Sequence, residues 1–132
     1  MASIALMLDD EVMDSPTVER RLDALARARA RDSFELWAAM SGGPSISMLR
    51  NGEHAWLMYL REPGDSGFWS VGDPTRAGVV AFRLSNGQVD EYPLAWCIAV
   101  ERGFEAVEAF CAWAGAMPAG VAWAEVEVVE RD

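Results

Sequence analysis

The sequence predicts an α+β domain in which antiparallel strands meander along the chain and pack against two helices. Two Asn-Gly pairs, at 51–52 and 86–87, each separate two strand-like runs, and such pairs favour tight hairpins. Two further segments, about 16–30 and 100–114, carry apolar residues at helical spacing. Strands that follow one another directly, with few helices between them, are typical of an antiparallel sheet with helices packed on it.

The first strand and the first helix are expected near the N-terminus. Residues 3–8 form a short apolar run, and the acidic stretch 9–14 is expected to be a solvated loop. Pro16 suits the first helical position, with Ser15 or Asp14 as the cap. The apolar stripe of this helix comprises Val18, Leu22, Leu25 and the stem of Arg29.

The middle of the chain predicts a run of strands, which are 33–40, 45–50, 54–61 and 68–71. Asn51 and Gly52 join the second of these to the third. The third strand is almost continuously apolar, so we expect it at the centre of the sheet and covered on both faces. Strands 79–84 and 88–98 flank the second Asn-Gly pair, and Pro93 indicates an edge or a bulge.

The last predicted elements are a helix and a strand. The helix carries an apolar stripe made of Val100, Phe104, Val107, Phe110, Cys111 and Ala114. Its opposite face carries Glu101, Glu105 and Glu108, and Gly115 and Pro118 follow as helix-ending residues. A final strand is expected over 120–129.

The length of 132 residues predicts one domain over 1–132. Cys97 and Cys111 lie in apolar surroundings without CxxC spacing, so buried free thiols are expected. The chain shows no secretory signal and no apolar run of the roughly 20 residues that cross a bilayer. We therefore expect a cytoplasmic protein that does not contact a membrane.

The tryptophans divide into a core set and two ambiguous members. The core set, which lies in apolar elements, is Trp56, Trp96, Trp113 and Trp123. Trp37 stands between a glutamate and an alanine and fits either face of its strand. Trp69 follows the flexible stretch 62–67, where a large aromatic side chain is either an interface anchor or part of the core.

The sequence offers little catalytic chemistry. Its one histidine, His54, lies in a predicted strand, where a structural role is the simpler interpretation. The Cys, His and carboxylate spacings do not suit zinc, and no Gly-rich loop is followed by the lysine of a phosphate site. Adjacent acids in a hydrated loop lack the desolvation that a general acid needs. We expect no enzyme activity, no metal and no cofactor.

The charge balance points to a class of partner. There are 21 acidic and 11 basic side chains, which gives a net charge of −10. Such a charge repels nucleic acid and anionic membranes and attracts a cationic partner, although it also serves solubility alone.

The segment 98–123, IAVERGFEAVEAFCAWAGAMPAGVAW, carries a specific combination. A strand ends at Ile98-Ala99, a helix places Ala106 and Phe110 four positions apart, and a turn containing Pro118 leads to Val121-Ala122-Trp123. This pattern resembles the first-numbered immunity family of bacterial polymorphic toxin systems, over about residues 79–126.

The resemblance implies a protein that binds a secreted toxin domain, often a nucleic-acid deaminase or nuclease, and blocks its active site. It implies no catalytic residues, and a monomer that acts in a 1:1 complex with a basic toxin domain. An acidic inhibitor would be steered electrostatically to a cleft that binds phosphates. The expected contacts, chosen on this physical ground, are loop acids and their neighbours: Asp9, Asp10, Glu11, Glu62, Asp65, Trp69 and Asp73. Weaker candidates are the α-helical acids Glu101, Glu105 and Glu108, which also fit a solvated face, and Glu125 and Glu127.

Two other functions remain open at this level. One is a chaperone or adaptor for a secreted effector, which would hold a segment of the effector and leave its activity intact. The other is a small ligand-binding α+β domain, which would need a deep pocket with converging polar groups.

Overall fold

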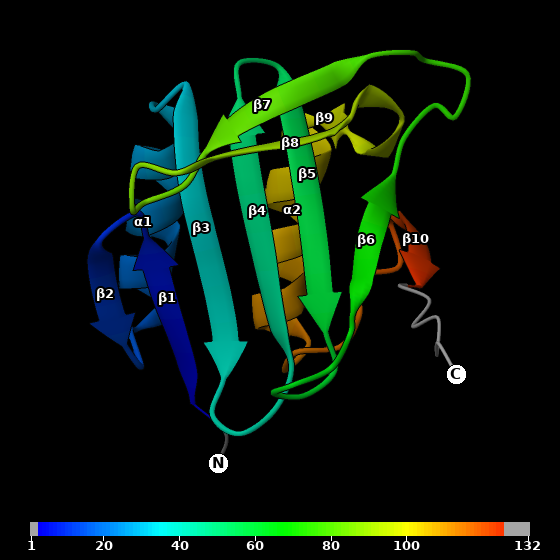
Figure 1. Ribbon diagram of the computed structural model, residues 1–132. Helices are drawn as coiled ribbons and strands as arrows, with labels where there is room; N and C mark the ends of the chain where they lie inside the picture. The colour runs from blue at the N-terminus through cyan, green and yellow to red at the C-terminus, as the bar shows by residue number, and fades with distance from the viewer. Residues whose placement is uncertain (1–2, 126–132) are drawn as a thin grey trace.

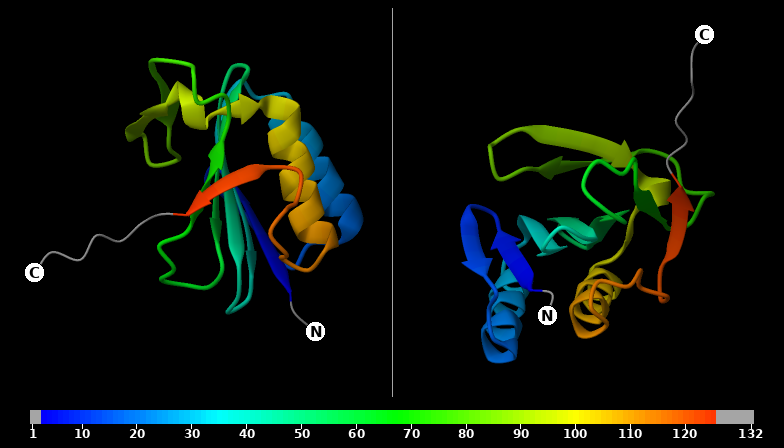
Figure 2. Two further views of the ribbon diagram at one scale, coloured as in Figure 1. Left: turned by 90° about the vertical axis from the view of Figure 1, so that its right-hand side faces the viewer. Right: turned by 90° about the horizontal axis from the view of Figure 1, so that it is seen from below.

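The computed structural model describes residues 3–125 and arranges them in three layers, with a sheet between a pair of helices and a short hairpin (Figures 1 and 2). The strands of the sheet are β1 (Ile4–Leu8), β2 (Glu11–Asp14), β3 (Ser33–Met40), β4 (Ser45–Asn51), β5 (His54–Leu60), β6 (Phe68–Val71), β9 (Ile98–Ala99) and β10 (Ala122–Glu125). Their order is β10-β6-β5-β4-β3-β1-β2, with β9 also paired to β5, and every pairing is antiparallel. The predicted α+β class is confirmed.

The β4–β5 hairpin forms where the first Asn-Gly pair predicts it. Asn51 is the last residue of β4 and pairs with His54, so the turn consists of Gly52 and Glu53. Gly52 has φ +60°, which suits a turn with glycine at its first central position. Asn51 therefore keeps strand geometry, and its side chain is free to donate a hydrogen bond to the carbonyl oxygen of Ala81 at 2.7 Å.

The acidic stretch 9–14 is not the solvated loop that the sequence predicts. Asp9 has φ +53° and turns the chain, and Glu11–Asp14 then pairs with β1 as an edge strand. Met13 stabilises this edge strand, because its side chain is buried in the core between the sheet and the helices.

The cap of helix α1 (Val18–Arg29) lies two to three residues later than predicted. Asp14 belongs to β2 and Ser15 has φ +47°, so Thr17 is the cap and its hydroxyl accepts a hydrogen bond from the N–H of Arg20 at 3.2 Å. The predicted stripe is wrong in its first half, because Val18 and Leu22 are exposed by 58% and 55%. The buried face comprises Ala24, Leu25 and Ala28.

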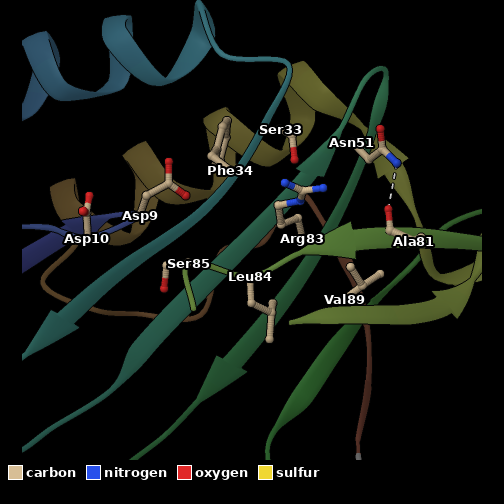
Figure 3. Close-up of a pocket in the computed structure, with 10 residues that line it drawn as sticks. All are labelled: Asp9, Asp10, Ser33, Phe34, Asn51, Ala81, Arg83, Leu84, Ser85 and Val89. Atoms are coloured by element: carbon tan, nitrogen blue, oxygen red, sulfur yellow. Dashed lines mark hydrogen bonds between the residues drawn. The ribbon is translucent and has the colours of Figure 1, made fainter. Parts of the chain in front are cut away.

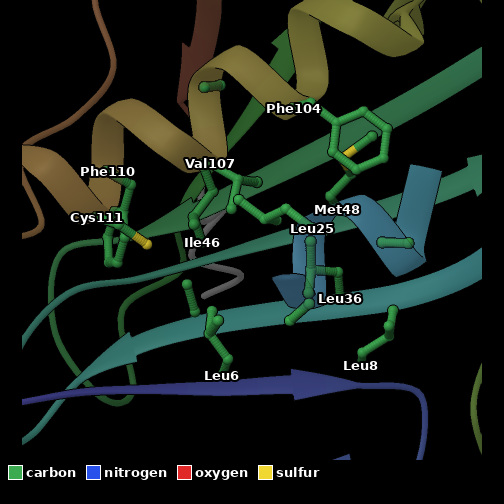
Figure 4. Packing of buried hydrophobic residues seen from close by; sticks show 14 of the residues in the cluster. Leu6, Leu8, Leu25, Leu36, Ile46, Met48, Phe104, Val107, Phe110 and Cys111 are labelled. Atoms are coloured by element: carbon green, nitrogen blue, oxygen red, sulfur yellow. The ribbon is translucent and has the colours of Figure 1, made fainter. Parts of the chain in front are cut away.

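Helix α2 (Val100–Ala112) confirms its predicted apolar face. Phe104, Val107 and Phe110 are fully buried against the sheet, together with Ala106 and Cys111 (Figure 4). The helix ends two residues before the predicted 114, because Ala114 and Gly115 adopt φ of +52° and +84°. The carbonyl of Gly115 then accepts a 2.7 Å hydrogen bond from the Tyr59 hydroxyl, which ties the helix end to β5.

The second predicted hairpin forms but leaves the main sheet. Strands β7 (Val79–Arg83) and β8 (Val89–Pro93) pair only with each other and cross the sheet on the side away from the helices (Figures 1 and 2). The predicted strand 88–98 is interrupted after Pro93 by a 3₁₀ turn, η1 (Leu94–Trp96).

The hairpin covers a second apolar cluster, of which the buried members are Leu49, Trp56, Val80, Phe82 and Cys97. Trp56 stacks on Tyr92 with ring centroids 4.0 Å apart, and Trp69 stacks on Trp96 at 4.3 Å. β5 therefore has apolar contacts on both of its faces, as its composition predicts.

Trp113 is 74% exposed and not in the core, because it follows the last residue of α2 and lies outside the apolar stripe of the helix. The last strand is described as Ala122–Glu125, and Glu127 lies outside the described residues.

Both cysteines are buried and free, as expected. Within residues 3–125, no helix is long and apolar enough to cross a membrane.

Candidate interaction surface

The seven predicted contact residues do not gather in one patch. Asp9, Asp10 and Glu11 lie at the β1–β2 turn, Glu62 and Asp65 follow β5, and Asp73 follows β6. These connections lie at three separated points around the sheet (Figure 1). Trp69 is on β6, partly buried by its stacking on Trp96.

Most of these acids are bound within the fold. Asp9 holds Arg31 with an oxygen–nitrogen distance of 2.6 Å and accepts a 3.0 Å hydrogen bond from the N–H of Glu35. Glu11 pairs with Arg27 at 2.8 Å, which connects the edge strand β2 to α1. These carboxylates therefore stabilise the β1–β2 turn and its contacts before any partner arrives.

Asp65 closes the β5–β6 loop. Its side chain is only 6% exposed, and it accepts hydrogen bonds from the Arg61 guanidinium at 2.9 and 3.0 Å and from the Arg61 N–H at 2.9 Å. The hydrogen bond from the guanidinium is the largest cause that holds the pKa of Asp65 far below its usual range. Asp73 similarly caps a turn through the hydroxyl and N–H of Thr75, which lower the pKa of its carboxyl.

Arg29 links the two helices. It lies 3.0 Å from Glu108 and 3.8 Å from Glu101, and its guanidinium stacks over the ring of Phe104 at 4.6 Å. Glu101 and Glu108 are thus ion-pair partners of an arginine of the same chain, whereas Glu105 remains on the solvated face of the helix.

A groove of about 620 Å³ lies between the tip of the β7–β8 hairpin and the sheet (Figure 3). Asp9 and Asp10 stand at one side of it, and Arg83 and Ser85 face them from the hairpin. The remaining lining residues are Ser33, Phe34, Asn51, Ala81, Leu84 and Val89. Two of the predicted contact residues, Asp9 and Asp10, therefore border this groove.

Glu35 anchors the hairpin over this groove. One carboxylate oxygen accepts hydrogen bonds from the N–H and hydroxyl of Ser85, at 3.0 and 2.8 Å, and the other accepts one from the Trp37 indole at 2.9 Å. Partial burial raises the pKa of Glu35, but the hydrogen bonds from Ser85 and Trp37 together outweigh it and lower the pKa.

The face of the sheet away from the helices carries a row of side chains that sequence reasoning missed. The strand register places the row in this order: Val12, Met7, Trp37, Ser47, Met58 and Trp69. Directly opposed residues of antiparallel strands point to the same face, so these side chains are neighbours. The available signal is the end of SFELWAAM, where the set that alternates with the core residues continues from Ser33 and Glu35 to Trp37 and Ala39 in place of polar side chains.

The described residues show no grouping of three or more His, Cys, Asp or Glu side chains that could hold a metal ion. His54 begins β5, where its backbone is paired with Asn51 and Ala99.

Comparison with known proteins identifies the family. The chain belongs to the family described as immunity protein Imm1, whose model matches residues 12–125. The resemblance in the C-terminal third is thereby confirmed, and the match extends through the N-terminal half to β2. No curated protein matches the chain.

Proposed function

We propose that this immunity protein neutralises one cognate secreted toxin domain by binding over its active site, as a monomer in a 1:1 complex. The toxin is a basic domain that acts on nucleic acid, as a deaminase or a nuclease. The immunity protein works in the cytoplasm of the producing cell by binding alone, without enzyme activity or cofactor. Membership of the immunity family supports the role, and the distribution of charge supports the class of toxin.

The observation that carries this proposal is that arginine side chains are bound to groups of the same chain. Within residues 3–125, six arginines are engaged with carboxylates or backbone carbonyls of the same chain, namely Arg27, Arg29, Arg31, Arg50, Arg61 and Arg102. The acids outnumber the basic residues by 21 to 11, so acidic side chains remain on the surface after this pairing. A toxin that handles phosphates needs a basic cleft, and such a cleft is complementary to this surface.

The test uses the toxin domain encoded beside the gene of this protein. Co-expression should restore growth, and the purified pair should elute as a 1:1 complex that lacks activity on nucleic acid. Association should slow as ionic strength rises, because salt screens the attraction of opposite charges. A complex that leaves the toxin active would contradict neutralisation and indicate a chaperone or adaptor. Toxin activity on a substrate other than nucleic acid would overturn the proposed toxin class.

A further inference from the structure

Among the elements of residues 3–125, none crosses one half of the sheet on the side away from the helices. The β7–β8 hairpin crosses the end of the sheet where β1 finishes and β3 begins, and leaves the opposite half of the same face open (Figures 1 and 2). We call this half the open face and define it by Met7, Trp37, Ala39, Ser47 and Met58. Met58 lies at its border, because it also packs against the apolar cluster under the hairpin. The pairings Met7–Trp37, Trp37–Ser47 and Ser47–Met58 make it continuous across four strands.

The composition of the open face is that of a contact surface. The solvated face of an antiparallel sheet normally carries polar side chains. Here Met7, Trp37, Ala39 and Met58 are partly exposed, and the small side chain between Trp37 and Met58 is the buried Ser47. A contiguous apolar surface of this kind marks an interaction site.

The indole ring of Trp37 is held in place by a hydrogen bond. Its indole N–H already donates to Glu35, which is in turn held by Ser85 of the hairpin. A partner that covers Trp37 therefore buries a large ring without leaving its polar atom unpaired and with little further loss of side-chain freedom.

Acidic side chains stand at both ends of the open face. At one end is the 620 Å³ groove with Asp9 and Asp10. At the other is a hollow of about 220 Å³ whose lining includes Ala5, Asp14 and Ala39. Ala5 pairs with both Asp14 and Ala39, so this aspartate belongs to the same face.

Positive charge is scarce on this face. None of the main-sheet strand positions that share it within residues 3–125 is an arginine, and Arg83 enters the groove from the hairpin. Arg50 belongs to the opposite face, where it donates to the carbonyls of Arg29 and Arg31. The apolar centre is therefore bordered mainly by negative charge.

We propose that the open face is the surface that docks the toxin, which rests on the function proposed above. The chemistry that fits is an apolar ridge that covers Trp37 and Met58 and is flanked by basic side chains that meet Asp10 at one end and Asp14 at the other. A second copy of this chain fits poorly, because a two-fold contact through this face would oppose the same acids without bringing arginines from the sheet to meet them.

The first test compares two tryptophans on opposite sides of the molecule. Trp37→Ala should weaken binding of the toxin domain encoded beside the gene by about 30-fold or more, the loss expected of a hot-spot residue. Trp113→Ala is the matched control: it removes an equally large, 74% exposed ring from the helix side and should leave Kd within about threefold. An unchanged Kd for Trp37→Ala, or a larger loss for Trp113→Ala, would overturn the proposal.

A second pair of variants excludes a loss of folding as the cause. Ala39→Arg places a long cation on the open face without removing a core contact, and Ala112→Arg places one on the exposed side of α2. Both should melt close to the wild type, and only Ala39→Arg should abolish growth rescue. Equal rescue by the two would reject the open face while leaving the proposed function intact.

Failure of the wild-type protein to bind the toxin would instead remove the proposed function itself. The mass of the free protein in solution addresses the other possible occupant. A monomer is expected, and a dimer that Ala39→Arg dissociates would assign the open face to self-association and overturn the toxin assignment.

Discussion

Glu35 and Ser85 lie 50 positions apart in the sequence and are joined by two hydrogen bonds, from the N–H and the hydroxyl of Ser85 to one carboxylate oxygen. This contact fastens the tip of the β7–β8 hairpin to β3. The other oxygen of Glu35 accepts a hydrogen bond from the indole N–H of Trp37. One carboxylate therefore sets both the position of the hairpin and the orientation of the Trp37 ring.

Replacement of this carboxylate should loosen the hairpin. In Glu35→Ala, the Ser85 and Trp37 donors lose their acceptor. The amides of residues 80–90 should therefore exchange with deuterium faster than in the wild type, and this increase should exceed that of the amides of β3 and β4. Ser85→Ala is the milder comparison, because it keeps the backbone N–H and only loses the hydroxyl. Hydrogen-exchange mass spectrometry checks the order, and equal protection of the hairpin in Glu35→Ala and the wild type would contradict the anchoring role.

Gly72 should tolerate no side chain. A Cβ at this position would lie 1.9 Å from the carbonyl oxygen of Cys97, which is backbone that cannot move without disturbing the contact of β6 with η1. Gly72→Ala should lower the free energy of unfolding by about 3 kcal/mol or more. Gly120→Ala, where nothing lies within 4 Å of the added carbon, should change it by less than about 1 kcal/mol. Equal urea midpoints for the two variants would show that the Gly72 contact relaxes freely.

The Asp65–Arg61 pair should make stability depend on pH in a defined direction. The pKa of Asp65 is depressed in the folded state, chiefly by the hydrogen bond from Arg61, so its contribution is complete above the unfolded-state value of about 3.9 and is lost as the pH falls toward the folded-state value. Asp65→Asn should therefore be less stable than the wild type at pH 7, and the difference should shrink below about pH 4. A difference in melting temperature that is the same at pH 7 and pH 3 would contradict this linkage.

Charge reversal at the ends of the open face should slow association with the toxin. Asp10 and Asp14 are suitable because both are exposed, whereas Asp9 is bound to Arg31. Asp10→Lys with Asp14→Lys should reduce the association rate by about tenfold at low salt, and the difference should diminish as salt screens the charges. Glu105→Lys, on the helix side, is the control, and a larger reduction from it would place the steering charge elsewhere.

The sequence predicted elements whose signals are local. Asn51-Gly52 indicated the β4–β5 hairpin because glycine adopts the positive φ that the turn needs. The spacing of Phe104, Val107 and Phe110 indicated the buried face of α2 because side chains three and four positions apart share one side of a helix.

Other predictions failed where a distant contact decides the outcome. The edge strand β2 forms because Met13 reaches the core, and the acids around it gave no sign of this. Val18 and Leu22 had the correct spacing, but the sheet receives only the later turns of α1. Trp113 leaves the core because α2 ends one residue before it.

The candidate surface illustrates the same division. The sequence indicated an acidic inhibitor with aromatic contacts, and it named Asp9 and Asp10, which border the groove. Sequence alone could not show that Asp9, Glu11 and Asp65 are held by arginines 22, 16 and 4 positions away. The row through Met7, Trp37 and Met58 was equally invisible, because it is created by the register of strands that are separate in the sequence.

The sequence by itself therefore determined the α+β class, the two hairpins, the α2 stripe and the acidic charge, because turn preference, periodicity and composition are properties of neighbouring residues. The tertiary structure alone decided which acids remain free and which face of the sheet is left open. Those properties depend on long-range packing: arginine pairing removes some carboxylates from the surface, and the place where the β7–β8 hairpin lies determines how much of the apolar sheet it covers.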